Sequence, residues 1–171
     1  MNPPHQLRFA ELSAKTMTAL LAGDLVAART ESGVELGGLF VGDRAKWLWN
    51  YRLEQLRTQP EAAPWIAQAV LSGPSDTVVG YAGFHGPPDA DGMVEVGYTV
   101  DPRYQRQGYA KAILAALIER ITADPAVRVL RATISPDNAA SLATIAPFGF
   151  TQNGEQWDEE DGLELIFERP V

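Results

Sequence analysis

The sequence predicts one α/β (α+β) domain, in which about four helices flank a mixed, mostly antiparallel central sheet. The chain has 171 residues, which is enough for one sizeable core and too short for two comfortable domains. Three strand-like segments follow one another over residues 65–100, and turn-forming residues join them, so an antiparallel meander is expected. Beyond residue 100, helix-like and strand-like segments alternate, so helices are expected to pack against the sheet.

The first third of the chain predicts one short strand and two helices. Residues 7–9 read as a strand, and residues 10–22 read as a helix that stops at Gly23. A loose, glycine-rich connection follows. A second helix is expected from Asp43, whose side chain can cap it, to about Arg57.

The middle of the chain carries the meander and the longest helix. The expected strands cover residues 65–71, 77–84 and 93–100. The last of them alternates, so that valines and Tyr98 face one side while Glu95 faces the other. A helix is then predicted, because its apolar residues recur at helical spacing: Ala110, Ile113, Leu114, Leu117, Ile118 and Ile121.

The last third predicts a strand, a short helix and a closing hairpin. The strand covers residues 128–134, the helix runs from Asn138 to about Pro147, and the hairpin strands cover residues 150–157 and 163–168. The predicted order is therefore β-α-α-β-β-β-α-β-α-β-β.

Composition excludes several classes of function. The net charge of −8 argues against nonspecific nucleic-acid binding and mildly favours a cationic or amine substrate. No run reaches the ~20 apolar residues of a membrane span, and the first residues lack a secretory signal pattern, so a cytoplasmic protein is expected. Cysteine is absent, and the two isolated histidines make no metal site. The acidic segment 155–164 is interpreted as a solvated hairpin loop.

The segment between the third meander strand and the long helix suits a pyrophosphate. A tight turn at residues 105–110 brings backbone amides outward, and Gly108 removes the Cβ that would block close approach. The first turn of the following helix adds unpaired N–H groups and a positive dipole end, and Arg106 adds charge.

This segment resembles motif A of the GNAT superfamily, the Gcn5-related N-acetyltransferases. Gln105, Gly108 and Ala110 match its pattern of Gln or Arg, two residues, Gly, one residue, and Gly or Ala. The resemblance continues from Asn138 to Ser141 and through the Phe-Gly-Phe at residues 148–150, so it covers the C-terminal half well and the N-terminal half in outline. It is most similar to the branch that includes ribosomal-protein N-terminal acetyltransferases. The resemblance implies central strands that splay apart around the cofactor's pantetheine arm.

The resemblance implies acetyl-CoA as co-substrate, with no metal. Its backbone contacts would come from the end of the strand before motif A, and its pyrophosphate would lie on the motif A amides. Asn138 and Ser141 match a second landmark near the pantetheine arm, although a helix cap alone also accounts for Asn138. The expected cofactor-binding residues are Tyr98, Thr99, Val100, Gln105, Arg106, Gln107, Gly108, Tyr109, Ala110, Lys111, Asn138 and Ser141.

The chemistry of acetyl transfer points to two catalytic candidates. Glu95 is the only acid in its strand and is proposed as the base that deprotonates the amine, the alternative being a solvated Glu on a half-exposed face. Many GNAT members place a proton-donating Tyr seven residues after the landmark Asn, where this chain has Ile145. Ser141, one turn earlier, is therefore expected to hydrogen-bond the thiolate.

Three further side chains are candidates for the acceptor site. Trp47 and Tyr51 lie one turn apart, off the apolar stripe of the second helix, and can wall the acceptor pocket or pack against a neighbouring loop. His85 begins a loop at a strand end and can face the acceptor or only the solvent.

The sequence thus predicts an acetyl-CoA-dependent N-acetyltransferase that works by direct attack of a primary amine in a ternary complex. The acceptor is a small amine or a peptide N-terminus; no nucleic acid or membrane is expected as partner, and a homodimer is compatible with the chain. The alternatives are a non-catalytic acyl-CoA-binding or regulatory module, transfer of a longer acyl group, and an interaction protein with an incidental Gly loop.

Overall fold

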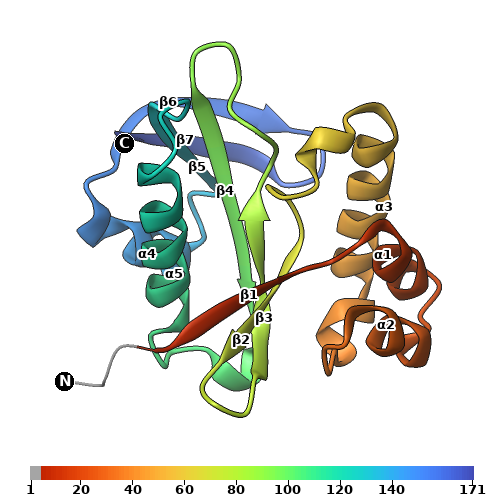
Figure 1. The fold of residues 1–171 in the computed structure, drawn as a ribbon. Helices are drawn as coiled ribbons and strands as arrows, with labels where there is room; N and C mark the ends of the chain where they lie inside the picture. The colour runs from red at the N-terminus through yellow and green to blue at the C-terminus, as the bar shows by residue number, and fades with distance from the viewer. Residues whose placement is uncertain (1–4) are drawn as a thin grey trace.

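The computed structural model describes residues 5–171 and builds them around one seven-stranded sheet (Figure 1). Residues 1–4, part of the segment expected to lack a secretory signal, lie outside the described residues. The strand order is β1-β2-β3-β4-β5-β7-β6, and of these neighbours β4 and β5 alone run parallel. The strands are β1 (Leu7–Glu11), β2 (Gln68–Ser72), β3 (Thr77–Phe84), β4 (Met93–Val100), β5 (Val129–Ile134), β6 (Thr151–Asp158) and β7 (Gly162–Pro170). The predicted mixed, mostly antiparallel sheet is confirmed.

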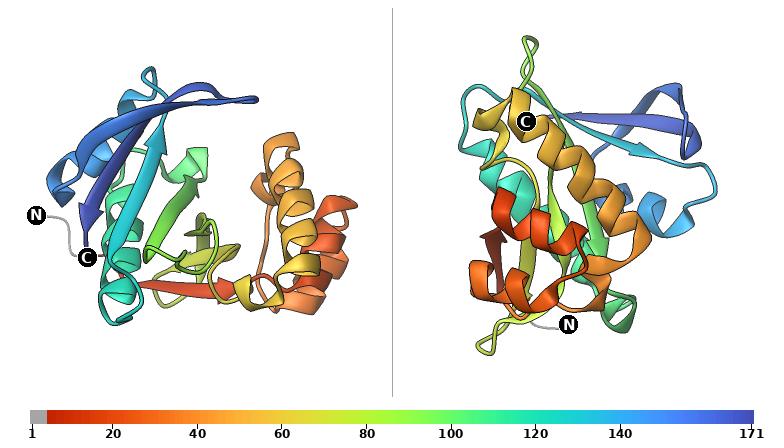
Figure 2. Two further views of the ribbon diagram at one scale, coloured as in Figure 1. Left: turned by 90° about the horizontal axis from the view of Figure 1, so that it is seen from above. Right: turned by 90° about the vertical axis from the view of Figure 1, so that its right-hand side faces the viewer.

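Two groups of α-helices cover the two faces of this sheet (Figures 1 and 2). Within residues 5–171 there are five: α1 (Ala14–Leu21), α2 (Leu25–Ser32), α3 (Asp43–Thr58), α4 (Tyr109–Thr122) and α5 (Ala139–Ile145). Short 3₁₀ turns lie at Gly38–Val41, Pro60–Ala62, Pro102–Tyr104 and Ala146–Phe148. None of these described helices has both the length and the apolar character that crossing a membrane requires.

Alternation along the strands divides the hydrophobic core between the two faces. In β2, Val70 packs with α4 and its neighbours, whereas Ala69 and Leu71 pack with α1, α2 and α3. On the face covered by α1, α2 and α3, Trp49 of α3 is fully buried. Its indole N–H donates to the carbonyl of Phe40 at 2.7 Å. This packing holds α3 beside the sheet and fixes the side chains that α3 presents along its exposed face.

The extra helix, α2, is a correction to the sequence prediction, which placed a loose connection there. Asp24 caps it by accepting a hydrogen bond from the Ala27 amide at 2.9 Å, and Gly33 closes it with a φ of +67°. Its pattern is weak because it buries Ala28 alone among its own residues. The cap and stop signals at Asp24 and Gly33 were the usable clue.

Three predicted boundaries also change. The first helix begins at Ala14, because Ser13 caps it and the chain is extended up to Glu11. Asp43 is the first residue of α3 and not its cap, since Gly42 precedes the helix without a side-chain bond. The first meander strand begins at Gln68 and not at residue 65, because the chain turns through Ala67 with a φ of +43°.

Candidate active site

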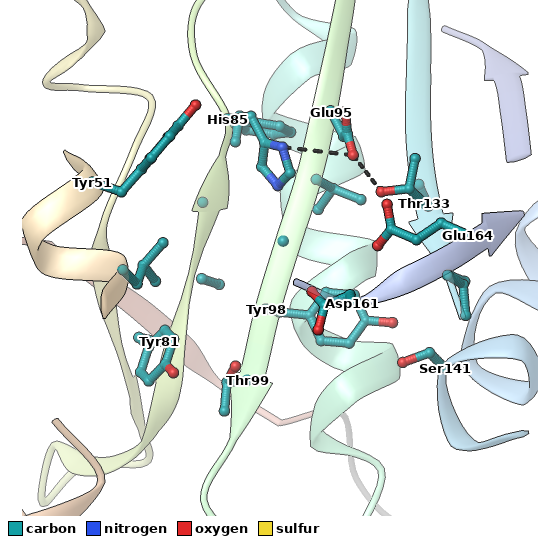
Figure 3. A pocket seen from close by; sticks show the side chains of 18 of the residues that line it. Tyr51, Tyr81, His85, Glu95, Tyr98, Thr99, Thr133, Ser141, Asp161 and Glu164 are labelled. Carbon is teal, nitrogen blue, oxygen red and sulfur yellow. Dashed lines mark hydrogen bonds and ion pairs between the residues drawn. The ribbon is translucent and has the colours of Figure 1, made fainter. Parts of the chain in front are cut away.

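A cleft of about 420 Å³ opens where β4 and β5 part (Figure 3). The two strands pair only from Met93 to Glu95 on β4 and from Val129 to Arg131 on β5. Beyond Glu95 the cleft is lined by β4 on one side and β5 on the other. The remaining walls come from α3, the end of β3, α5 and the hairpin of β6 and β7. The splay implied by the sequence resemblance is therefore present.

The loop after β4 has the predicted shape for an anion. Arg106 and Gly108 both have positive φ, +58° and +88°, so successive amides turn toward the same side. The Gln105 side chain donates to the Val100 carbonyl at 3.2 Å and ties the loop to the strand end. The first backbone bond of α4 runs from the Ala112 amide to the Gly108 carbonyl at 3.1 Å, which leaves earlier amides at the open helix end.

His5 lies against the same loop, a contact that no sequence pattern signals. Its ring stacks on Tyr109 with centroids 3.9 Å apart, and its Nε2 lies 2.8 Å from the Gln107 carbonyl. Residues 105–111 do not line the cleft itself but lie where β4 leads into α4. Of the cofactor candidates, the structure brings Tyr98, Thr99, Asn138 and Ser141 into the cleft.

The cofactor landmark on α5 doubles as a helix cap. The Asn138 side-chain oxygen accepts a hydrogen bond from the Ser141 amide at 3.0 Å, so the capping interpretation is confirmed. Ser141 presents its hydroxyl to the cleft (Figure 3). Ile145, which stands at the usual Tyr position, is 3% exposed and belongs to the core.

The side chain of Tyr98 lies near the hydroxyls of Thr144 and Ser141 on α5, the helix on which Ile145 stands at the usual Tyr position. It crosses from β4 toward α5, and burial raises the pKa of its phenol, while the neighbouring hydroxyls of Thr144 and Ser141 act in the opposite direction. The phenol therefore stays protonated and can donate a hydrogen bond. The sequence prediction assigned Tyr98 for its backbone and placed its side chain on the same strand face as the valines.

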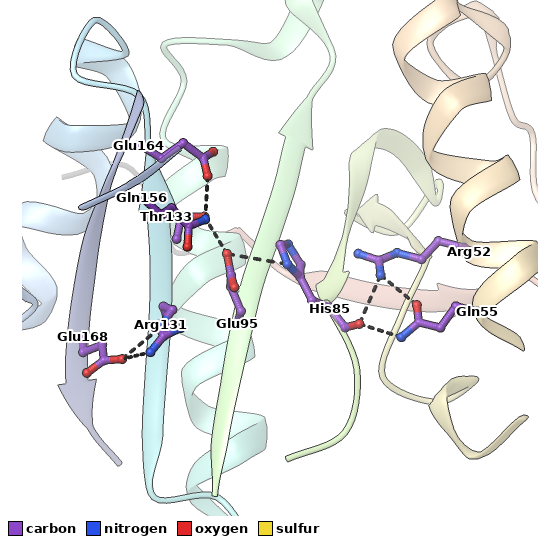
Figure 4. Close-up of polar contacts among 9 residues, drawn as sticks. All are labelled: Arg52, Gln55, His85, Glu95, Arg131, Thr133, Gln156, Glu164 and Glu168. Carbon is purple, nitrogen blue, oxygen red and sulfur yellow. Dashed lines mark hydrogen bonds and ion pairs between the residues drawn. The ribbon is translucent and has the colours of Figure 1, made fainter. Parts of the chain in front are cut away.

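Glu95 lies at the point where the strands part, within a polar cluster (Figure 4). The Thr133 hydroxyl donates to its Oε1 at 2.5 Å, and Nδ1 of His85 lies 3.6 Å from the same oxygen. The His85 carbonyl accepts hydrogen bonds from Arg52 at 3.1 Å and from Gln55 at 2.8 Å. The structure therefore brings Glu95 and His85 together, although the sequence prediction gave them separate roles.

The two aromatic candidates of α3 line the cleft mouth. The Trp47 and Tyr51 rings stack with centroids 5.7 Å apart, and both side chains are about half exposed. The structure thus places both in the expected cavity wall.

The acidic hairpin is more than the solvated loop that the sequence suggested. Asp158, Asp161 and Glu164 all line the cleft. Asp161 pairs with Arg44 of α3 at 3.2 Å, so the hairpin tip meets the helix across the mouth. The predicted solvated hairpin is present, since no residue of segment 155–164 is buried. Its contact across the cleft was not predicted, because the long-range return of β6 and β7 leaves no local signal.

The chain belongs to the GNAT acetyltransferase family, because the family model described as "Acetyltransferase (GNAT) domain" matches residues 40–151. An uncharacterized N-acetyltransferase of Bacillus subtilis strain 168, YjdG, is 33% identical over 76 residues. That match covers 44% of this chain and 45% of YjdG, so it spans less than half of that relative's length.

Two solved structures of similar fold cover nearly the whole chain. The ribosomal-protein-S5-alanine acetyltransferase of Vibrio fischeri superposes with a TM-score of 0.64 and 16% identity, over 99% of this chain and 94% of its own. The microcin C7 self-immunity acetyltransferase MccE was solved with acetyl-CoA and AMP. It superposes with a TM-score of 0.65 and 15% identity, over 97% of this chain and 93% of its own. At these identities the likeness shows the fold alone.

Proposed function

We propose that this protein transfers the acetyl group of acetyl-CoA to a primary amine by direct attack in a ternary complex. The observation that carries the proposal is the continuity of the cleft. Its inner part lies along the open edge of β4, beside Ser141 and Asn138, and its mouth lies between Trp47 and the acidic hairpin. One cavity can therefore hold a thioester and an amine side by side, as direct transfer requires.

Acetyl-CoA fits the inner part of the cleft together with the adjoining loop after β4, by chemistry that this chain supplies. The turned loop at Arg106 and Gly108 offers amides to a pyrophosphate, and the β4 residues beyond Glu95 offer backbone groups that β5 does not pair. When bound, acetyl-CoA would supply an activated acetyl thioester. MccE was solved with acetyl-CoA, which agrees with this assignment for the shared fold.

Two hydroxyls stand where the departing sulfur would need a donor. Ser141 faces the cleft from α5, and Tyr98 faces Ser141 from β4. A hydrogen bond from either would stabilise the thiolate as the bond to the acyl carbon breaks. We assign this end of the reaction to both groups, in place of the Tyr that Ile145 replaces.

The mouth of the cleft favours an acceptor with more than one positive charge. Asp158 and Glu164 face it from the hairpin, and Trp47, stacked on Tyr51, offers an aromatic face to a cation from the opposite wall. Asp161 is already paired with Arg44. A polyamine or an amine-bearing antibiotic fits this lining better than a simple monoamine, and a basic peptide N-terminus remains within the same chemistry.

The test is an acetyl-CoA turnover screen that follows free thiol release. The panel pairs each diamine, polyamine, aminoglycoside and basic peptide with a monoamine of similar length. We expect the multiply charged member of a pair to have the higher kcat/KM. If no amine raises thiol release above acetyl-CoA alone while calorimetry still shows binding, the non-catalytic acyl-CoA-binding module is correct. If a longer acyl-CoA turns over faster with the same amine, the acyl group must be reassigned.

A further inference from the structure

His85 and Glu95 form a fixed pair at the start of the open cleft. Glu95 belongs to β4, and His85 directly follows β3, where its amide donates to the Glu95 carbonyl at 2.8 Å. The His85 carbonyl is held from the other side by Arg52 and Gln55 of α3. The backbone of His85 is therefore clamped between a strand and a helix, which fixes where its ring can lie (Figure 4).

The two ring nitrogens of His85 face different parts of the site. Nδ1 lies 3.6 Å from Oε1 of Glu95, and the two form an ion pair when the imidazole is protonated. Nε2 lies on the opposite side of the ring, above Gly97, where an added Cβ would come within 3.2 Å of it. Gly97 belongs to the part of β4 that has separated from β5. Nε2 therefore faces the beginning of the open edge.

Accessibility separates the two members of the pair. The His85 side chain is 48% exposed and lines the cleft, whereas the Glu95 side chain is 17% exposed. The same Glu95 oxygen also accepts the Thr133 hydroxyl at 2.5 Å. An amine that enters the cleft meets the imidazole before it meets a carboxylate that two neighbours already engage.

The surroundings of the ring lower the pKa of His85 and favour the neutral imidazole. Loss of hydration within the cleft walls lowers the pKa of His85 below its ordinary 6.5, Arg52 lowers it further, and Glu95 opposes both. Asp161 and Glu164 line the facing wall from the hairpin. At neutral pH one nitrogen is therefore free to accept a proton.

We propose that His85, through Nε2, is the base that deprotonates the acceptor amine, and that Glu95 is a positioning residue that holds Nδ1–H toward itself. This inference rests on the proposed acetyl transfer and reassigns the role first given to Glu95. A carboxylate that orients an imidazole in this way fixes its tautomer and stabilises the imidazolium that forms.

The proton balance is complete without any further reactant. The ammonium form of the acceptor gives one proton to Nε2, and its nitrogen then bonds to the acyl carbon. The carbon–sulfur bond breaks with its electron pair on sulfur; the nitrogen loses a second proton and the sulfur gains one. The imidazolium returns the first proton to solvent, so amine cation and thioester become amide, thiol and one free proton.

Activity measurements on paired variants give the first test. A general base contributes about 10²–10⁴-fold, so His85→Gln should lower kcat/KM by at least about 10²-fold with acetyl-CoA affinity unchanged by calorimetry. Glu95→Gln keeps an oxygen facing Nδ1 and should cost less, on the order of tenfold. Free imidazole should partly rescue His85→Ala and leave Glu95→Ala unchanged. If Glu95→Gln loses more activity than His85→Gln, Glu95 is the base and the inference is overturned.

Imidazole NMR gives a second test that needs no turnover. The chain has two histidines, so the His85 signal is identified by its absence from His85→Gln. We expect the Nδ1–H tautomer, a pKa below 6.5, and a further fall in that pKa in Glu95→Gln, because the opposing anion is gone. An Nε2–H tautomer at neutral pH would overturn the inference. A wild-type protein that acetylates no amine refutes the proposed function instead, whatever tautomer is found.

Discussion

Strand β4 is paired over five residues on its β3 edge and over three on its β5 edge. On the first edge the antiparallel register runs without interruption from Val96 opposite Phe84 to Val100 opposite Gly80. On the second edge pairing ends at Glu95, and a cleft takes the place of the ladder. One strand thus contributes to stability through one edge, and under the proposed function its unpaired backbone groups on the other edge bind the ligand.

Gly80→Ala should break the closed edge and have the largest effect. A Cβ at Gly80 would lie 2.1 Å from the Thr99 carbonyl oxygen, so the two strands must move apart. We expect a loss of about 3 kcal/mol in the free energy of unfolding, measured by urea denaturation. Gly154→Ala in β6 is the matched control, because its Cβ would make only an ordinary 3.6 Å contact. Equal stability of the two variants would contradict the close approach.

Gly108→Val should leave the sheet intact and weaken acetyl-CoA binding at the loop that follows β4. Gly108 has a φ of +88°, which a branched residue resists, and a bulky side chain would fill the space above the loop amides. We expect acetyl-CoA affinity to fall roughly 30- to 100-fold by calorimetry, which corresponds to one or two charged hydrogen bonds. Gly149→Ala, at a φ of +72° with open space around it, controls for backbone strain alone. Wild-type affinity in a folded Gly108→Val would remove the loop from this role.

Ser141→Ala and Tyr98→Phe should each slow turnover about tenfold. Each removes a hydroxyl whose hydrogen bond to the departing sulfur would stabilise the transition state by ~1–2 kcal/mol. Thiol release at saturating acetyl-CoA measures the loss. Thr122→Val, which removes the hydroxyl that donates to the Ile118 carbonyl on α4, should leave the rate unchanged. If one of the two variants matches wild type, its residue loses the role and the other keeps it; if both do, water supplies the donor.

The smallest effect concerns the pH dependence of stability and His85, which lies beside Glu95 where the pairing of β4 with β5 ends. Because the pKa of His85 is lower in the folded state, the unfolded chain binds a proton first as pH falls through about 6.5. Wild type should therefore lose stability between pH 7.5 and 5, and His85→Gln should lose less. Exposure of the ring keeps the difference below about 1 kcal/mol. If the difference in the free energy of unfolding between wild type and His85→Gln does not change with pH, the lowered pKa of His85 is contradicted.

The sequence predicts the closed edge better than the open one. Residues 77–84 and 93–100 are strands with the expected bounds, because turn residues and alternation are local signals. The loop at Gly108 was also predictable, since its shape depends on adjacent residues. α2 was missed because a helix that buries so little of its own surface has almost no periodic pattern.

The meeting of distant residues in the cleft could not be predicted from the sequence. Thr133 reaches Glu95 across 38 positions, and Arg44 reaches Asp161 across 117. Arg52 is buried at 7% exposure, although a charged residue on a helix is ordinarily expected to face solvent. Such contacts depend on how the sheet twists and where the hairpin returns, which no local spacing records.

The stacked pair at the cleft mouth has an optical consequence. Of the four tryptophans in the chain, Trp49 is fully buried and Trp157 is 77% exposed on the hairpin. Trp47 alone both lines the cleft and stacks on a tyrosine there. A molecule that separates or covers this stack changes the polarity around one emitter while the buried indole stays constant. We therefore expect the intrinsic fluorescence of the protein to change when a molecule occupies the cleft mouth, without a label and without turnover.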